Sequence, residues 1–179
     1  MKIGIYIGSF NPPHLGHLKV AEFVLEKKLV DKVLILPTPA YWDKQNFVSD
    51  KDRVNMLKFF EKDGIIVDDI HNKDPYTYLT LNSLKNDYPN DTLYLIIGSD
   101  NLEHFHEWKN IGDILKNHII VLNRGSIKKN ELLNDYDDMF IYCDEYKYID
   151  ISSTKIRNGK VSTMIDGIDK YIKDNHLYE

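Results

Sequence analysis

The sequence predicts an α/β fold in which a doubly wound, mostly parallel sheet is flanked by helices. Two observations support this. Short apolar runs alternate along the 179 residues with longer segments whose apolar residues recur at helical spacing. That alternation is typical of parallel strands joined by right-handed crossover helices. We also find no linker, repeat or low-complexity segment, so we expect residues 1–179 to form a single domain.

Six apolar runs have the composition of buried strands. They are rich in Ile, Leu, Val and Tyr, and several stop at turn-forming residues such as Gly8, Pro37 and Gly98. Residues 126–137 are polar and poorly patterned, so we expect them at the surface. The expected strands span residues 3–7, 32–37, 65–67, 92–97, 118–122 and 139–143.

Helical spacing of apolar residues marks the segments between these strands. The first helix follows the turn-forming residues 8–13 and should end near Leu29. Ser49 or Asp50 can cap the second, whose Phe59 is expected to face inward. We expect helices over residues 15–29, 51–62, 76–87 and 163–174, a short helix that Trp108 begins, and another capped by the hydroxyl residues 152–154.

The carboxyl ends of parallel strands lie along one edge of a sheet, where free N–H groups of helix N-termini attract phosphate. Cationic and hydrogen-bonding side chains should gather at that edge, with one carboxylate suited to a hydrated Mg²⁺ or a ribose. These residues are His14, His17, Lys44, Asp100, Arg124 and Arg157. The sequence therefore predicts a phosphate-binding site.

His14 and His17 stand three residues apart at the start of the first expected helix, so both rings can point at one anion. An isolated pair at this spacing is more often a structural and a surface histidine, but the preceding turn favours a site. Gly16 between them indicates close approach of another chain segment or of a ligand.

Composition narrows the range of functions. A net charge of −5 argues against a general nucleic-acid-binding protein. We see no apolar stretch of about 20 residues and no signal segment, which predicts a cytoplasmic protein outside membranes. The chain has 20 lysines but only three arginines, so Arg53, Arg124 and Arg157 are candidates for contacts that need the planar, bidentate guanidinium group. For Arg53, a surface salt bridge is an equally frequent role. The phosphate-binding motifs of P-loop kinases and dinucleotide-binding dehydrogenases are missing.

Two motifs carry a family resemblance. Residues 8–17, G-S-F-N-P-P-H-L-G-H, and residues 151–157, I-S-S-T-K-I-R, resemble the paired signatures of the nucleotidyltransferase superfamily, whose sheet is Rossmann-like. Over nearly its whole length the chain is most similar to the bacterial nicotinate mononucleotide adenylyltransferases, with further similarity at residues 53–56, 76–81 and 98–100, at Trp108 and near the C-terminus.

This resemblance implies transfer of the adenylyl group of ATP to the 5′-phosphate of nicotinate mononucleotide, with Mg²⁺ carried by the ATP phosphates and no metal site on the protein. It implies that His14, His17, Lys44 and Arg157 act on the phosphates, with His17 nearest the α-phosphate. The implied ATP-binding residues are Gly8, Ser9, Phe10, Gly16, Gly98, Asp100, Arg124, Ile151, Ser152, Ser153 and Thr154. The implied acceptor-binding residues are Asn11, Lys44, Tyr76, Thr77 and Trp108.

Two alternatives stay open at this point. Asn11 replaces the usual Asp of the family, and residues 41–44 keep its lysine but not its prolines and histidine, so a sibling enzyme that uses nicotinamide mononucleotide or another phosphorylated acceptor is an alternative. A nucleotide sensor without turnover is the second, although it would have no need of His17. A homo-oligomer is compatible with the sequence.

Overall fold

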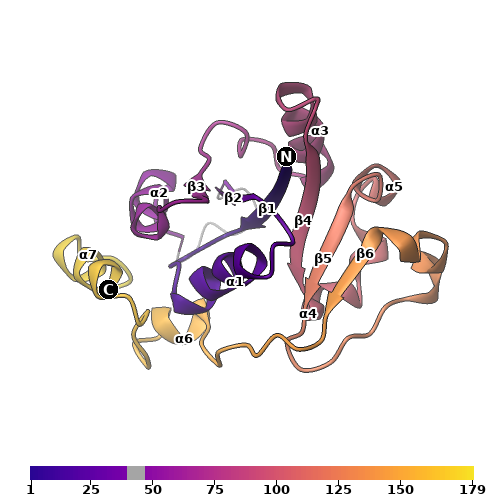
Figure 1. Ribbon diagram of the computed structural model, residues 1–179. Helices are drawn as coiled ribbons and strands as arrows, with labels where there is room; N and C mark the ends of the chain where they lie inside the picture. Colours follow the sequence, from indigo (N-terminus) through magenta and orange to yellow (C-terminus); the bar gives the residue numbers. More distant parts are fainter. Residues whose placement is uncertain (40–46) are drawn as a thin grey trace.

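The computed structural model describes residues 1–39 and 47–179, and it contains a six-stranded sheet whose paired strands all run parallel (Figure 1). The strand order is β3-β2-β1-β4-β5-β6, so the winding reverses between β1 and β4, where ligands of open α/β sheets bind. The strands are β1 (Lys2–Gly8), β2 (Lys32–Pro37), β3 (Ile65–Val67), β4 (Thr92–Gly98), β5 (His118–Leu122) and β6 (Phe140–Cys143).

Helices cover both faces of this sheet, as Figure 1 shows. The α-helices are α1 (Leu15–Glu26), α2 (Asp50–Leu57), α3 (Thr77–Asp87), α4 (Ser99–Leu102), α5 (Ile111–Ile114), α6 (Ser153–Arg157) and α7 (Asp166–Asp174). Short 3₁₀ helices are η1 (Lys58–Phe60), η2 (Phe105–Glu107) and η3 (Glu131–Met139). In the part of the chain that the structure describes, no helix is both long and apolar enough to span a membrane.

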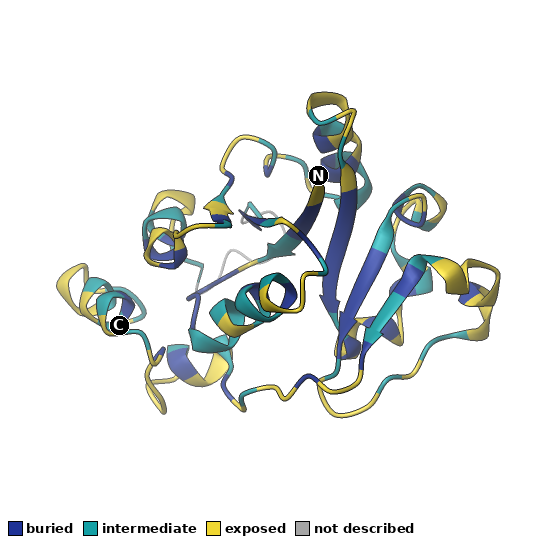
Figure 2. Cartoon of the chain, in the orientation of Figure 1, coloured by how far each residue is buried: buried dark blue, intermediate teal, exposed yellow. Residues whose placement is uncertain are grey.

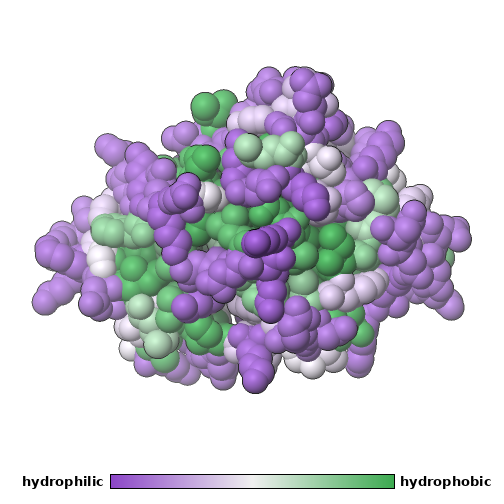
Figure 3. Space-filling model, viewed as in Figure 1, coloured by the Kyte–Doolittle hydropathy of each residue, from purple (hydrophilic) through white to green (hydrophobic). Residues whose placement is uncertain are grey.

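Alternate residues of the strands other than the short edge strand β3 enter two separate cores, because successive side chains of a strand point to opposite faces. On β2, Leu34 belongs to one core with Leu81 of α3, whereas Ile35 belongs to the other with Val24 of α1 and Met56 of α2. Figure 2 shows the resulting pattern of buried strands and helices that are exposed on one side, and Figure 3 shows hydrophilic residues over most of the periphery. The predicted doubly wound fold is confirmed.

Several predicted helix boundaries are wrong. The first helix ends at Glu26, since the backbone of Lys28 turns to φ 56°. The second ends at Leu57 in the 3₁₀ turn η1, which leaves Phe59 51 % exposed. Trp108 lies in extended chain after η2, and the next helix begins only at Ile111.

Two observations concern the last third of the chain. The polar segment expected at the surface is largely exposed and contains η3, which Asn130 caps by accepting a hydrogen bond from the Leu132 N–H. The last helix begins at Asp166 and not at Thr163, because Thr163 is fully buried and its N–H donates to the carboxylate of Asp169.

Candidate functional site

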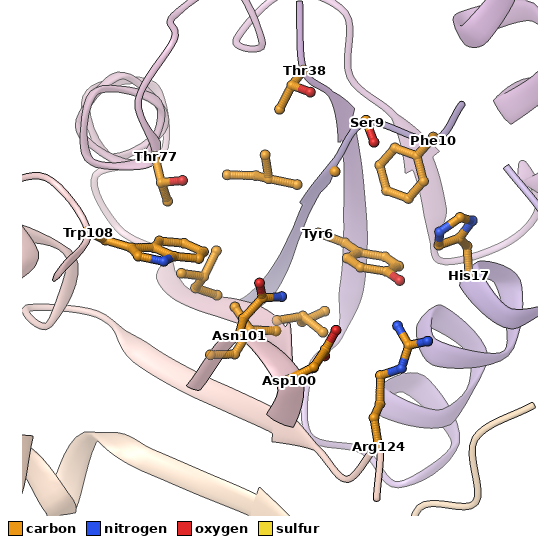
Figure 4. Close-up of a pocket in the computed structure, with 16 residues that line it drawn as sticks. Tyr6, Ser9, Phe10, His17, Thr38, Thr77, Asp100, Asn101, Trp108 and Arg124 are labelled. Carbon is orange, nitrogen blue, oxygen red and sulfur yellow. The ribbon is translucent and has the colours of Figure 1, made fainter. Parts of the chain in front are cut away.

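A cavity of about 370 Å³ opens at the carboxyl ends of β1 and β4, at the reversal of the strand order. Figure 4 shows Trp108 and Thr77 on one side of it and His17 and Arg124 on the other, with Tyr6 and Asp100 between them. Of the residues predicted from the sequence, the structure places nine in its lining: Gly8, Ser9, Phe10, His17, Thr77, Gly98, Asp100, Trp108 and Arg124.

Five other predicted residues line two further cavities. His14, Gly16 and Ile151 line a small cavity that shares His17, Tyr6 and Arg124 with the main one. Arg157 and Thr154 line a polar cavity of about 390 Å³ beside Tyr178. Ser152 caps α6, Ser153 begins it, and Lys44 lies outside the described residues.

The two histidines form a reciprocal cap at the start of α1. Nδ1 of His14 accepts a hydrogen bond from the Gly16 N–H, and Nδ1 of His17 accepts one from the His14 N–H, both at 3.1 Å. The rings stack with 3.7 Å between their centroids. Because each Nδ1 is an acceptor, the proton of each neutral ring resides on Nε2. The helix start therefore supplies two ring N–H donors whose tautomers are set by the backbone.

Both imidazoles are uncharged at neutral pH. Burial, followed by the nearby Arg124, lowers the pKa of His14 to about 4. Burial lowers the pKa of His17 well below its usual value, and His14 and Arg124 add to that effect. The histidines thus act as hydrogen-bond donors, while the positive charge at this side of the cavity comes from Arg124.

The low pKa of His14 predicts a loss of stability at acid pH. The unfolded chain takes up this proton near pH 6.5 and the folded chain only near pH 4, so the free energy of unfolding falls as the pH is lowered through that interval. The shift corresponds to roughly 3 kcal/mol. His14→Asn keeps an acceptor at the N-cap and removes the titration. In urea unfolding from about pH 7 to about pH 4, wild type should lose stability relative to this variant; a constant difference would contradict the assignment.

Two glycines allow the close packing of this site. A Cβ on Gly16 would lie 2.9 Å from the His14 ring and 3.1 Å from Ile151, so the expected close approach is that of the chain itself. A Cβ on Gly98 would lie 2.4 Å from the Asp100 carboxylate and 2.9 Å from the Arg124 side chain. Larger residues at either position would displace groups that line the cavity.

The other side of the cavity is aromatic. Trp108 packs edge-to-face on Phe105, with ring centroids 4.8 Å apart, and it also lines a second space of about 410 Å³ with Tyr76 and Thr77. The ammonium of Lys109 lies 4.4 Å from the centre of the Tyr76 ring. This side offers a flat apolar surface and a nearby cation.

Two further residues support the site, and neither was predicted to bind a substrate. Arg53 is fully buried; its Nη2 forms a salt bridge with the half-exposed Asp50, and its Nη1 uses the planar fork to donate to the carbonyls of Ser9 and Thr38. The scarcity of arginine was the signal that pointed to it. Tyr6 lines both the main and the small cavity, and burial raises the pKa of its hydroxyl. A tyrosine two residues before the end of a buried strand was the available signal.

Comparison with known proteins gives consistent results. A family model described as cytidylyltransferase-like matches residues 5–159. A protein of Borreliella burgdorferi named "Probable nicotinate-nucleotide adenylyltransferase" is 35 % identical over 192 residues, which cover 99 % of this chain and 97 % of that protein. A protein of the same name from Flavobacterium johnsoniae is 36 % identical over 166 residues, covering 89 % and 86 %.

Solved structures resemble the fold. The nicotinic acid mononucleotide adenylyltransferase of Plasmodium falciparum, complexed with NaAD, superposes with a TM-score of 0.79 at 22 % identity and covers 99 % of this chain and 97 % of its own. The Vibrio parahaemolyticus structure titled a putative nicotinate-nucleotide adenylyltransferase gives a TM-score of 0.69 at 22 % identity, covering 99 % of this chain and 94 % of its own. At these identities the likeness shows a shared fold.

Proposed function

Because this chain belongs to the cytidylyltransferase-like family, and within it to the nicotinate-nucleotide adenylyltransferases, we propose that it transfers the adenylyl group of ATP to the 5′-phosphate of nicotinate mononucleotide. The products are nicotinate adenine dinucleotide and pyrophosphate. The observation that carries this proposal is the two-sided cavity, with the His17 ring and Arg124 on one side and Trp108 on the other (Figure 4).

In this reaction an oxygen of the acceptor phosphate attacks the α-phosphorus of ATP, and the bond from that phosphorus to the bridging oxygen breaks. Pyrophosphate leaves with the electron pair. The acceptor phosphate is already anionic, so the chain needs no general base, and its contribution is positioning and charge stabilisation. We propose that the Nε2–H of His17 and the guanidinium of Arg124 contact the oxygens on which negative charge develops. His14 would supply a second ring N–H donor beside them.

We also assign the β- and γ-phosphates to α6. Arg157 is the last residue of this helix, and its side chain is held in place, since its Nη1 donates to the Asn11 carbonyl at 2.8 Å and its Nη2 to the Thr154 hydroxyl at 3.3 Å. Asp100 is the carboxylate among the described residues that line the main cavity, and a hydrated Mg²⁺ needs few protein ligands when phosphates supply the rest. Mg²⁺ entering with ATP would neutralise phosphate charge, with Asp100 next to it.

Lys109 favours an acidic acceptor ring. Its ammonium lies over the Tyr76 ring in the space that Trp108 also lines, where a pyridine carboxylate would meet a positive charge and a carboxamide would gain less. Glu107 also borders this space, but its carboxylate is 3.2 Å from the imidazole of His104. The local charge thus supports nicotinate over nicotinamide mononucleotide.

The test is pyrophosphate release from ATP by the purified protein. We expect release only when a pyridine mononucleotide is present, and kcat/KM for nicotinate mononucleotide at least about tenfold above that for the nicotinamide form. A higher value for the nicotinamide form would replace this proposal by the sibling activity. ATP binding without pyrophosphate from either acceptor would identify a nucleotide sensor.

Trp108→Ala should weaken acceptor binding and leave ATP binding nearly unchanged. Stacking of a base on an aromatic side chain is worth about 1–3 kcal/mol, so the KM for the mononucleotide should rise by about tenfold or more. Trp108→Phe keeps a ring on Phe105 and should retain much of the affinity. Steady-state kinetics with each substrate varied in turn measures both effects, and loss of ATP affinity with an unchanged acceptor KM would refute the stacking role.

A further inference from the structure

Residues 9–13, the loop between β1 and the histidine cap, are hydrogen-bonded by distant parts of the chain. The carbonyl of Asn11 accepts from Arg157 at 2.8 Å, and the carbonyl of Pro12 accepts from the Ser153 hydroxyl at 2.8 Å. The N–H of Leu15 donates to the carbonyl of Thr163 at 2.9 Å. The start of α1 is thus held by α6 and by the chain that follows it.

The C-terminal tail adds one more contact to this loop, and the end of α7 directs it there. His176 adopts φ 53°, its N–H donates to the Lys173 carbonyl, and the N–H of Leu177 donates to the Ile172 carbonyl. This is the hydrogen-bond pattern of a Schellman motif, which ends a helix and reverses the chain. Leu177 then packs against the core beside α7, and Tyr178 follows it.

The hydroxyl of Tyr178 donates to Oδ1 of Asn11 at 2.6 Å, and the N–H of Val48 donates to the same oxygen at 3.3 Å. Asn11 is only 2 % exposed, so water competes little for this oxygen. Burial raises the pKa of Tyr178, so the hydroxyl keeps its proton over the physiological range. Tyr178 therefore fixes the side chain of Asn11 while Arg157 fixes its backbone.

We propose that Tyr178 is a positioning residue for the adenylyl transfer described above, an inference that rests on the proposed function. Its hydroxyl fixes Asn11, and Asn11 is joined through two prolines to His14. The N–H of His14 is the donor that keeps the proton of His17 on Nε2. When the loop shifts, this N–H loses its alignment with Nδ1, and the ring N–H at the cavity loses its fixed direction.

Tyr178→Phe removes only the hydroxyl. We expect kcat to fall by about tenfold, with both KM values within about twofold, because the substrates still bind while His17 is poorly oriented. Tyr171→Phe is the matched control: the Tyr171 hydroxyl donates to Asp52 at 2.7 Å and accepts from Asn55 at 3.1 Å, so these bonds join α7 to α2 and not to the loop, and kcat should stay unchanged. Equal kcat values for the two variants would overturn the proposal.

A second readout does not depend on turnover. Two-bond ¹⁵N–¹H correlation spectra at neutral pH report on which ring nitrogen carries the proton, and spectra of His14→Asn and His17→Asn assign the signals. We expect the Nε2–H pattern for both rings in wild type and in Tyr171→Phe, and averaging between tautomers for His17 in Tyr178→Phe. An unchanged His17 pattern in Tyr178→Phe would reject the positioning role.

The two readouts separate the two hypotheses. If wild type makes no pyrophosphate with either mononucleotide, the proposed function fails, and the His17 tautomer still decides whether Tyr178 orients the ring. If wild type is active and Tyr178→Phe matches it in kcat and in tautomer, the positioning role fails while the proposed function stands.

Discussion

Replacing His17 by asparagine should lower kcat at least about a hundredfold, because the ring N–H at the cavity is lost. The structure distinguishes the two nitrogens of this ring. Nδ1 accepts the His14 N–H and belongs to the helix cap, whereas Nε2 carries the donor hydrogen. Asparagine keeps an oxygen near the position of Nδ1 and has nothing at the position of Nε2. Stability should therefore change by less than about 1 kcal/mol.

His17→Ala separates the two roles further. It removes the donor and the cap together, so kcat should fall as far as in His17→Asn, while unfolding in urea should reveal an additional cost of about 1 kcal/mol. Stopped assays of pyrophosphate release measure the rates. A His17→Asn variant that unfolds, or that retains near-wild-type kcat, would show that the role of His17 is purely structural.

Replacing Arg53 by methionine should destabilise the protein by about 3 kcal/mol or more. The guanidinium is fully buried, and its Nη1 donates to the Ser9 carbonyl at 2.8 Å and to the Thr38 carbonyl at 2.6 Å. These two residues follow β1 and β2, so one side chain from α2 joins the ends of two strands beside the cavity. Methionine fills part of the volume and leaves both carbonyls without this donor.

Asp50→Asn is the matched control for this prediction. Nη2 of Arg53 pairs with the Asp50 carboxylate, which is 53 % exposed, so water can solvate the asparagine that replaces it and the loss should be about 1 kcal/mol. Chemical unfolding of both variants should therefore show a large loss for Arg53→Met and a small one for Asp50→Asn. Similar small losses would mean that the ion pair with Asp50, and not the hydrogen bonds to the two carbonyls, accounts for the contribution of Arg53 to stability.

Local patterns predicted the sheet well, and the reason is physical. A strand buried on both faces must be apolar throughout, so the runs at residues 32–37 and 118–122 were visible in the sequence and match β2 and β5. Caps are equally local: Ser49 and Ser152 accept hydrogen bonds from N–H groups three residues on, as their positions indicated. Convergence of His17, Asp100 and Arg124 on one cavity then follows from parallel topology.

Contacts between distant residues could not be predicted in this way. Nothing in the spacing of residues near Arg53 indicates that it donates to a carbonyl 44 residues earlier, or that Asn11 accepts from Tyr178. Phe59 has the chemistry of a core residue, yet the 3₁₀ turn at the end of α2 directs it outward. The substrate roles of the site residues, Asn11 and Tyr76 included, stay predictions, and those of Lys44 concern a residue outside the described ranges.

The donors to residues 9–13 have a consequence for biosynthesis. The side-chain donors lie 44, 141, 146 and 167 residues further along the chain than their acceptors. On a ribosome, β1, α1 and β2 are made early, whereas Tyr178 is added 167 residues after Asn11. A nascent chain can thus bury most of its sheet before the loop ahead of the histidines has its full set of hydrogen bonds. Competence to handle ATP is then expected only after the segment that contains Tyr178 has been synthesised.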